Sequence, residues 1–170
     1  MKFNHFLTSY IPDLSIGFKT HFENMIEQSI FAEECGYNTV SIPEHHLVNL
    51  LMMPSPLQMA VKIATLTKNI NIATSVAVLP LHDMRTYAGE ISTADILTDG
   101  RLIFGVGRGA FAWEMNRLGS PIDTSKEKFI ESLEVLILLL SKKDVGFKGK
   151  YYNFDPITIM PRPISNPIQF

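Results

Sequence analysis

Two segments of the sequence carry residue types that could do chemistry. Glu44, His45 and His46 are adjacent, and the glycine-rich segment 105–109 contains Arg108. A histidine that faces a pocket can act as an acid or a base near neutral pH, with Glu44 or another neighbour orienting its ring. Glycines let the backbone approach a flat or phosphorylated ligand, and arginine adds a fixed positive charge. The two segments therefore predict an acid–base site and an anion site.

The same segments also have other interpretations. Adjacent strand residues point to opposite faces, and the sequence offers no second cluster of metal ligands at suitable spacing, so no metal is expected. Gly105, Gly107 and Ala110 match the dinucleotide pattern G-x-G-x-x-A, but that pattern should open a helix in the first βαβ unit. The remaining alternatives are a glycine-rich turn with Arg108 in an ion pair, and a histidine pair that faces solvent.

The composition of the chain limits its class. Of its 170 residues, 46% are hydrophobic and 19% are charged, as in a globular protein of one domain. The formal net charge of −2 gives no reason to expect nucleic acid or a membrane as partner. Residues 135–140 form the longest apolar run, too short to cross a bilayer, and residues 1–10 lack a secretory pattern. These features predict a cytoplasmic protein.

Strand-like and helix-like segments alternate along the chain. Strands are expected at 2–7, 38–42, 70–79 and 101–106, and helices at 21–35, 56–68, 84–98 and from about 124. The second helix should have Ser55 as its N-cap and Pro56 at its first position. Cys35, in the first helix, is expected to be a small buried side chain, and as the single cysteine it excludes an internal disulfide.

The fourth helix has its own sequence signature. Thr124 and Glu127 have the spacing of a capping box, which would place the start of the helix there. Its expected apolar face consists of Phe129, Ile130, Leu133, Leu136, Ile137 and Leu140. Residues 147–170 depart from the alternation of strands and helices. They are expected to form a hairpin-like excursion that ends in a proline-rich segment.

This alternation predicts an α/β fold with a parallel sheet and helical crossovers. An open doubly wound sheet and a (βα)8 barrel both have this pattern, and both bind ligands at the carboxyl ends of their strands. The segments that follow or end the four strands should therefore lie on one rim: 8–10, 43–46, 74–75 and 105–109.

Taken in order, these segments resemble the flavin-dependent luciferase-like monooxygenase family. The matching segments are MKFNHFLTSYIP, AEECGYNTVSIPEHH, NIATSVAVLP, ADILTDGRLIFGVGRG, TSKEKFIESLEVL and FKGKYYNF with the later PRP. The resemblance implies a (βα)8 barrel that binds FMN on this rim. It implies a reduced-FMN, O2-dependent monooxygenase that oxygenates an aldehyde or another small organic substrate, with a separate flavin reductase as partner.

The resemblance also assigns roles to individual residues. His45 inherits the role of the catalytic acid or base, with Glu44 beside it. Ser75 and Val76 match a position under the flavin ring where the family has a cis peptide bond. Arg108 matches an arginine that contacts the FMN phosphate, and Gly107 and Gly109 flank it. Lys126 stands where the family commonly has another arginine, and Gly107 replaces a reactive cysteine of the luciferase loop, which argues against features specific to light emission.

Length is the main departure from the family, whose members are about twice as long. Residues 1–170 are expected to be a single luciferase-like domain that stops near the start of a fifth strand, with four βα units and the excursion. The chain could be a truncated product or part of a longer enzyme, or it could complete a barrel as a homo- or hetero-oligomer. It could also be a non-catalytic flavin-binding or self-associating half-barrel. A deazaflavin-dependent oxidoreductase is a further alternative within the fold.

Overall fold

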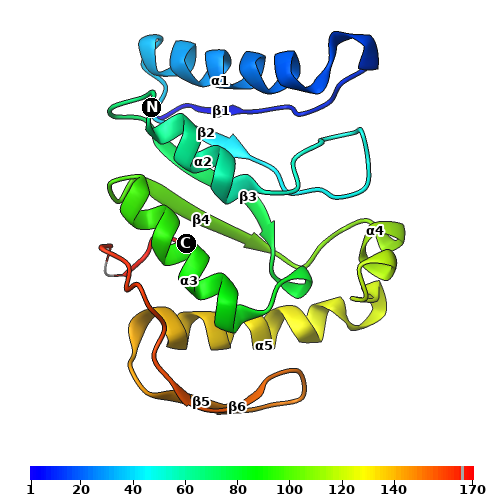
Figure 1. Ribbon diagram of the computed structural model, residues 1–170, viewed down its shortest axis with the longest axis vertical. Helices are drawn as coiled ribbons and strands as arrows, with labels where there is room; N and C mark the ends of the chain where they lie inside the picture. The colour runs from blue at the N-terminus through cyan, green and yellow to red at the C-terminus, as the bar shows by residue number, and fades with distance from the viewer. Residues whose placement is uncertain (166) are drawn as a thin grey trace.

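The computed structural model describes residues 1–165 and 167–170 and contains a parallel sheet whose strand order follows the chain (Figure 1). Its strands are β1 (Asn4–Phe6), β2 (Thr39–Ile42), β3 (Asn71–Val78) and β4 (Leu102–Gly107). The order β1-β2-β3-β4 has no reversal, so the sheet is not the doubly wound sheet of a dinucleotide-binding fold. The prediction of a barrel-type α/β arrangement is confirmed.

Helices and short turns connect the strands. The helices are α1 (Phe18–Glu34), α2 (Pro56–Ala64), α3 (Met84–Leu97), α4 (Ala112–Arg117) and α5 (Ile122–Ser141). Two 3-10 turns occupy Leu14–Ile16 and Leu79–Leu81. The strands β5 (Val145–Lys148) and β6 (Asn153–Ile157) form the antiparallel hairpin expected in the excursion.

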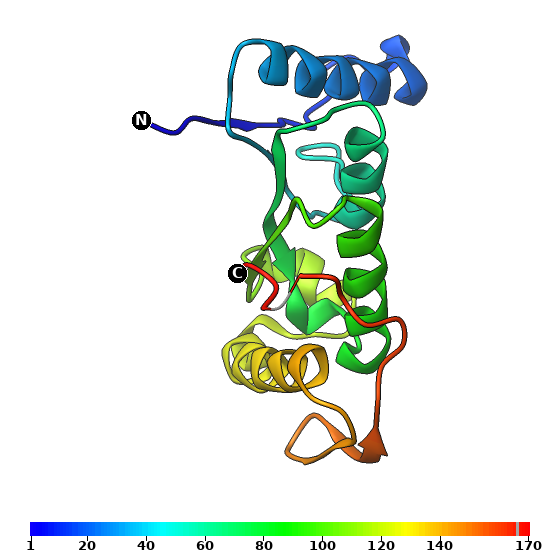
Figure 2. The ribbon, with the colours of Figure 1, turned by 90° about the vertical axis from the view of Figure 1, so that its left-hand side faces the viewer.

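The helices cover one side of a curved sheet (Figure 2). Helices α2 and α3 lie along one face, and α1 and α5 lie near the two edges of the sheet. The opposite face stays open at Phe6, Ser75 and Val76, which are exposed. In a (βα)8 barrel the inward face of the strands is the one that helices do not cover. The open face therefore corresponds to the inside of such a barrel.

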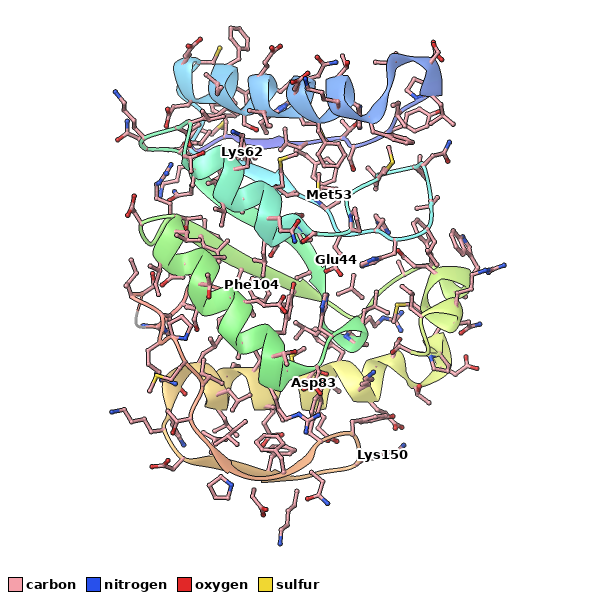
Figure 3. All side chains as sticks on the ribbon, viewed as in Figure 1. Glu44, Met53, Lys62, Asp83, Phe104 and Lys150 are labelled. Atoms are coloured by element: carbon pink, nitrogen blue, oxygen red, sulfur yellow. The ribbon has the colours of Figure 1, made fainter. Side chains whose placement is uncertain are left out.

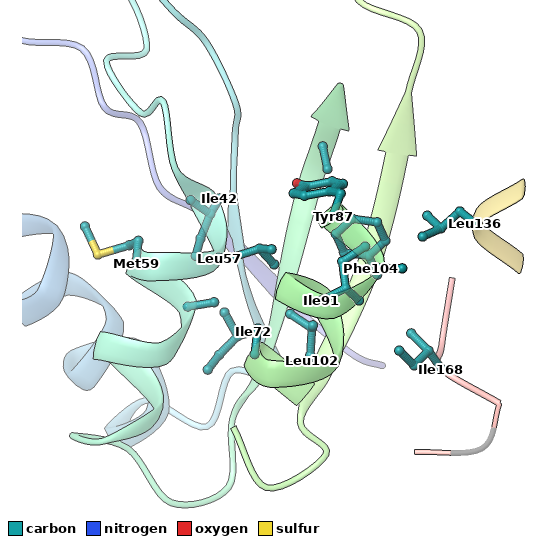
Figure 4. Close-up of a cluster of buried hydrophobic side chains, with 14 of the residues drawn as sticks. Ile42, Leu57, Met59, Ile72, Tyr87, Ile91, Leu102, Phe104, Leu136 and Ile168 are labelled. Atoms are coloured by element: carbon teal, nitrogen blue, oxygen red, sulfur yellow. The ribbon is translucent and has the colours of Figure 1, made fainter. Parts of the chain in front are cut away.

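The core lies between the sheet and the helices α2, α3 and α5 (Figure 4). Phe104 of β4 is completely buried and contacts Tyr87 of α3 edge-to-face, with ring centroids 5.8 Å apart. Ile72 and Leu102, also buried, point to the same side of the sheet. Because alternate residues of a strand face opposite sides, this packing fixes which side chains of β3 and β4 face the open side.

The fourth helix differs from its sequence-based prediction. It begins at Ile122 with Pro121 as N-cap, and Thr124 donates a hydrogen bond to the Pro121 carbonyl instead of capping the helix. Glu127 is recruited by the hairpin, because Lys150 Nζ donates to its carboxylate over 2.7 Å. The capping-box prediction was therefore wrong. A proline at this position already fixes a φ compatible with helix entry.

Other corrections concern burial and capping. Ile130 and Ile137 of α5 are 56% and 46% exposed, because the apolar face of this helix is wider than the surface it packs against. Cys35 follows the end of α1 and is exposed rather than buried. Pro56 does occupy the start of α2, but the Ser55 side chain makes no capping hydrogen bond.

Carboxylates of two helices hold the backbone of nearby loops and turns. Glu33 of α1 accepts hydrogen bonds from three consecutive backbone N–H groups, those of Lys68, Asn69 and Ile70. Glu131 of α5 does the same for the residues of the hairpin turn, Lys150, Tyr151 and Tyr152. Each carboxylate satisfies donors that a turn would otherwise leave unpaired.

The C-terminal segment returns to the sheet beside β4. Phe104 N donates to Gln169 O over 2.8 Å, and Ile103 and Gln169 form a parallel bridge. The sequence predicts a fifth strand starting near this point, and the bridge lies where a fifth parallel strand would pair. Buried Asp95 of α3 holds the segment, accepting hydrogen bonds from Ile164 N and Ser165 N at 2.8 Å each.

Replacement of Asp95 by alanine should release this segment. Three hydrogen bonds to one buried carboxylate are lost, so we expect the free energy of unfolding to fall by about 2–3 kcal/mol in urea denaturation. Amide exchange should accelerate at Ile164 and Ser165. The control is Asp155→Ala, which removes an exposed carboxylate of β6 and should change the stability by less than about 0.5 kcal/mol. Equal effects of the two substitutions would contradict the anchoring role.

Within the described ranges, 1–165 and 167–170, the structure contains no helix with both the length and the apolarity needed to cross a membrane.

Candidate functional site

The polar segments predicted from the sequence meet at the carboxyl ends of the strands. Glu44 lies two residues after the buried end of β2 and is itself 1% exposed, and Figure 3 shows it at the side of the sheet where α4 lies. Its Oε2 accepts a hydrogen bond from Val78 N at the end of β3 (2.7 Å). Its Oε1 accepts from His46 Nε2 (2.8 Å) and from His82 Nε2 (2.7 Å). One buried carboxylate thus joins the ends of two strands and two imidazoles.

These contacts change the proton affinity of the groups involved. Burial acts to raise the pKa of Glu44, but hydrogen bonds from His46, His82 and Val78 outweigh it and hold that pKa below its ordinary value. The hydrogen bond to Glu44 raises the pKa of His46 above its ordinary value, against the opposing effect of burial. The carboxylate is therefore ionised at neutral pH and favours a charged imidazole beside it.

His45 has a different carboxylate partner. Its Nδ1 lies 3.2 Å from Glu114 Oε2, and the Glu114 side chain is 2% exposed. The other oxygen of Glu114 accepts a hydrogen bond from the backbone N–H of His46. Phe111 packs against the His45 ring at a centroid distance of 4.9 Å. Within the described residues no hydrogen bond is made to His45 Nε2, so this nitrogen remains available to exchange a proton.

The structure thus assigns the two carboxylates differently from the simplest prediction. Glu44 orients His46 and His82, whereas the residue that contacts the ring of His45 is Glu114. Glu114 lies on α4, a short helix that is not among those predicted from the sequence. A signal for it was present, because Glu114 is the only acidic residue between Arg101 and Ile122 and has apolar neighbours. His82 was likewise not predicted as a site residue.

The glycines of segment 105–109 are required by packing. Gly105 and Gly107 lie in β4 itself, opposite an irregularity in the pairing of β3 between Thr74 and Ala77. A Cβ atom on Gly105 would overlap the Thr74 carbonyl oxygen, and one on Gly107 would overlap the Val76 side chain. Their need for glycine is therefore explained by the close approach of β3, without reference to a ligand.

The irregular part of β3 includes the two residues expected beneath the flavin ring. Ser75 and Val76 are joined by a cis peptide bond, as the resemblance implied. Both side chains are exposed on the open face of the sheet.

Two cations lie beyond the strand ends. Arg108 directly follows β4 and is exposed, and Lys126, in the second turn of α5, is exposed as well. Among residues 1–165 and 167–170 neither side chain forms an ion pair, so the alternative that Arg108 serves an internal ion pair is wrong for this part of the chain. Gly109 has a φ of 86°, in the left-handed region that favours glycine, and a Cβ there would meet Met115.

Comparison with known proteins identifies the family. The model of the luciferase-like monooxygenases matches residues 1–170. The chain belongs to the luciferase-like monooxygenase family. It is 38% identical over 85% of its length to the uncharacterized protein y4vJ of Sinorhizobium fredii, of which it covers 41%. It is 29% identical over 88% of its length to the oxygenase component of the flavin-dependent trigonelline monooxygenase of Acinetobacter baylyi, covering 42% of that protein.

A solved structure shares the fold, and a further relative has a different cofactor in its name. The monooxygenase RslO1 of Streptomyces bottropensis superposes with a TM-score of 0.93 at 25% identity, over 99% of this chain and 52% of that one. The F420-dependent glucose-6-phosphate dehydrogenase of Amycolatopsis mediterranei is also similar, with 30% identity over 88% of this chain and 49% of that one. The chain therefore spans about half the length of the relatives it matches, and two of these relatives are named for different cofactors, a flavin and F420.

Proposed function

We propose that the protein is a flavin-dependent monooxygenase that uses reduced FMN and O2 to oxygenate a small organic, aldehyde-like substrate. The observation that carries the proposal is the environment of His45. Its Nδ1 faces the buried carboxylate of Glu114, while Nε2 has no partner among the described residues. A ring held in this way at a strand end can pass a proton between Nε2 and a bound substrate. We further propose that residues 1–170 belong to one luciferase-like domain.

The residues at the rim fit an FMN molecule. Its phosphate group needs cations without other partners, and Arg108 and Lys126 form no ion pair in the described chain. Its ring system needs open surface beside a proton-exchanging group. Ser75 and Val76 offer such surface on the open face of the sheet. The phosphate would be held by Arg108 and Lys126, and the ring would lie against β3.

In the proposed reaction, bound reduced FMN supplies the electrons that activate O2. His45 holds or accepts the proton that moves during oxygenation, and the Glu114 carboxylate positions its ring. Phe111 packs against that ring and limits access of water to it. Glu44 holds His46 in place beside His45 and links the ends of β2 and β3.

The proposed partner is a separate flavin reductase that supplies reduced FMN. It is supported by the similarity to a protein whose name describes it as an oxygenase component. The F420-dependent relative makes the cofactor the first point to test.

Anaerobic titration of the protein with reduced FMN and with reduced F420, followed by fluorescence, separates the two cofactors. We expect reduced FMN to bind more tightly, and O2 uptake to depend on a small aldehyde. Preferential binding of F420 would replace the proposal by a deazaflavin-dependent oxidoreductase. Flavin binding without substrate-dependent O2 uptake across an aldehyde and ketone panel would indicate a non-catalytic flavin-binding protein.

Replacement of Arg108 by alanine should weaken FMN binding through the phosphate. The loss of one charge-assisted hydrogen bond at an exposed position should raise the Kd of FMN about tenfold. Riboflavin, which lacks the phosphate, should bind both proteins equally. Lys19→Ala, which removes an exposed lysine of α1, is the matched control for lost positive charge and should change neither Kd. A riboflavin Kd that rises together with that of FMN would contradict the phosphate contact.

A further inference from the structure

His82 is connected to the rim although the proposed reaction does not use it. Its Nε2 and that of His46 donate to the same carboxylate oxygen, Glu44 Oε1, at 2.7 and 2.8 Å. The second oxygen of Glu44 is already occupied by Val78 N. The two imidazoles therefore depend on a single buried negative charge, while the second oxygen of Glu44 keeps the link to β3.

The position of His82 is fixed by its surroundings. Its ring stacks on that of Tyr87, with centroids 3.8 Å apart and planes 2° apart. Its carbonyl oxygen accepts a hydrogen bond from Tyr152 Oη (3.2 Å), and the carbonyl of neighbouring Pro80 accepts one from Lys128 Nζ (2.7 Å). The 3-10 turn, α3, α5 and the hairpin thus all hold this ring with Nε2 toward Glu44.

His82 and His46 lie on different sides of Glu44. His82 lines a cavity of about 770 Å³ between α2, α3 and residues 159–161, on the outer side of the sheet. His46 is adjacent to His45, at the rim where the open face ends. Glu44 therefore joins His82, which lines this cavity, to the His45–His46 pair at the rim.

We propose that His82 is a positioning residue of the site, which shares one excess proton with His46 through Glu44. Two imidazolium ions on one carboxylate oxygen would repel each other in a poorly hydrated environment, while Glu44 provides only one negative charge. The consequence for catalysis rests on the proposed function, because it assumes that the histidine pair acts on substrate.

The surrounding charges favour His46 as the holder of this proton. Its ring lies near two carboxylates, Glu44 and Glu114, and its pKa is raised. Around His82 the acidic and basic groups are mixed; they are Glu44, Tyr87, Asp83, Arg85, Glu90 and Lys128. A charge on His46 should oppose a second charge on His82, because both rings donate to the same oxygen of Glu44.

Proton binding to each ring can be followed by NMR of the chain labelled with 15N-histidine. In the His46→Gln variant, His82 should bind its proton about tenfold more tightly than in the wild type, because the competing charge is gone while glutamine can still donate to Glu44. In the wild type, the ring nitrogens of His46 should show a second inflection at the pH where His82 titrates. The His82→Gln variant should lose that inflection.

His5→Gln is the matched control, since His5 is a half-buried histidine of β1 that contacts Gln28 of α1, and its replacement should leave both titrations unchanged. The inference is wrong if His82 titrates identically in the wild type and in His46→Gln, or if the second inflection of His46 persists in His82→Gln. The wild-type measurement tests the coupling even if a variant does not fold.

The effect of His82 on the reaction is tested by the pH dependence of kcat, measured with reduced FMN and an aldehyde. His82→Gln should shift the acidic limb of this profile with little change in KM, whereas His5→Gln should not. If the acidic limb of the kcat profile does not shift in His82→Gln, His82 is not a positioning residue. Absence of oxygenation by the wild type would contradict the proposed function, while the ring titrations would still decide whether the proton is shared.

Discussion

His45→Ala should reduce kcat for oxygenation by a factor of about 10²–10⁴ and leave the Kd of reduced FMN unchanged. The substitution removes a ring nitrogen at the rim, Nε2, whose ring Glu114 orients and which has no partner in the described chain. It does not touch Arg108 or the open face of β3, on which the flavin is proposed to lie. Stopped-flow measurement of product formation, together with the anaerobic flavin titration, checks both parts.

The matched control for this experiment is His5→Ala, which removes a histidine of β1 that points toward α1. It should retain the wild-type kcat. If His45→Ala oxygenates at the wild-type rate, His45 is not the acid or base of the reaction. Partial restoration of the rate by added imidazole in His45→Ala alone would strengthen the assignment.

Phe104→Ala should lower the free energy of unfolding by about 3–5 kcal/mol, measured by urea denaturation. Phe104 is fully buried and contacts Tyr87 of α3 and Phe170 of the C-terminal segment, with ring centroids 5.8 and 6.2 Å apart. Truncation therefore leaves a cavity where α3, β4 and this segment meet. Because β4 leads directly to Arg108, weaker flavin binding should accompany the loss of stability.

Phe31→Ala provides the comparison, since Phe31 of α1 is 65% exposed. It should cost less than about 1 kcal/mol. A loss as small as this in Phe104→Ala would show that the surroundings of Phe104 collapse to fill the cavity.

The sequence predicted those elements whose signals are local. The β-branched run at 70–79 became β3, Asn71–Val78, because β-branched side chains favour strands. Pro56 marked the start of α2, and Gly36 followed the end of α1 with a φ of 80°. The start of α5 was predicted wrongly because Glu127, which has the spacing of a capping residue, is bound by Lys150 of the hairpin instead.

The site was only partly predictable for a similar reason. The rim position of the His45–His46 pair follows from the strand that precedes it, and so does that of Arg108. The pairing of His45 with Glu114 spans 69 positions in the chain and depends on a helix of only six residues, whose periodicity is too short to recognise. The sharing of Glu44 between His46 and His82 depends on the register of β2 against β3, which no local pattern encodes.

The strand order has a consequence for synthesis of the chain. Each strand pairs with the one made just before it, so β2 can dock on β1, β3 on β2 and β4 on β3 as the chain leaves the ribosome. The side chain that secures a returning loop, such as Glu33 for the loop before β3, is also made earlier than the loop it holds. The sheet can therefore assemble during translation, because no strand from β2 to β4 needs a strand made later in order to pair.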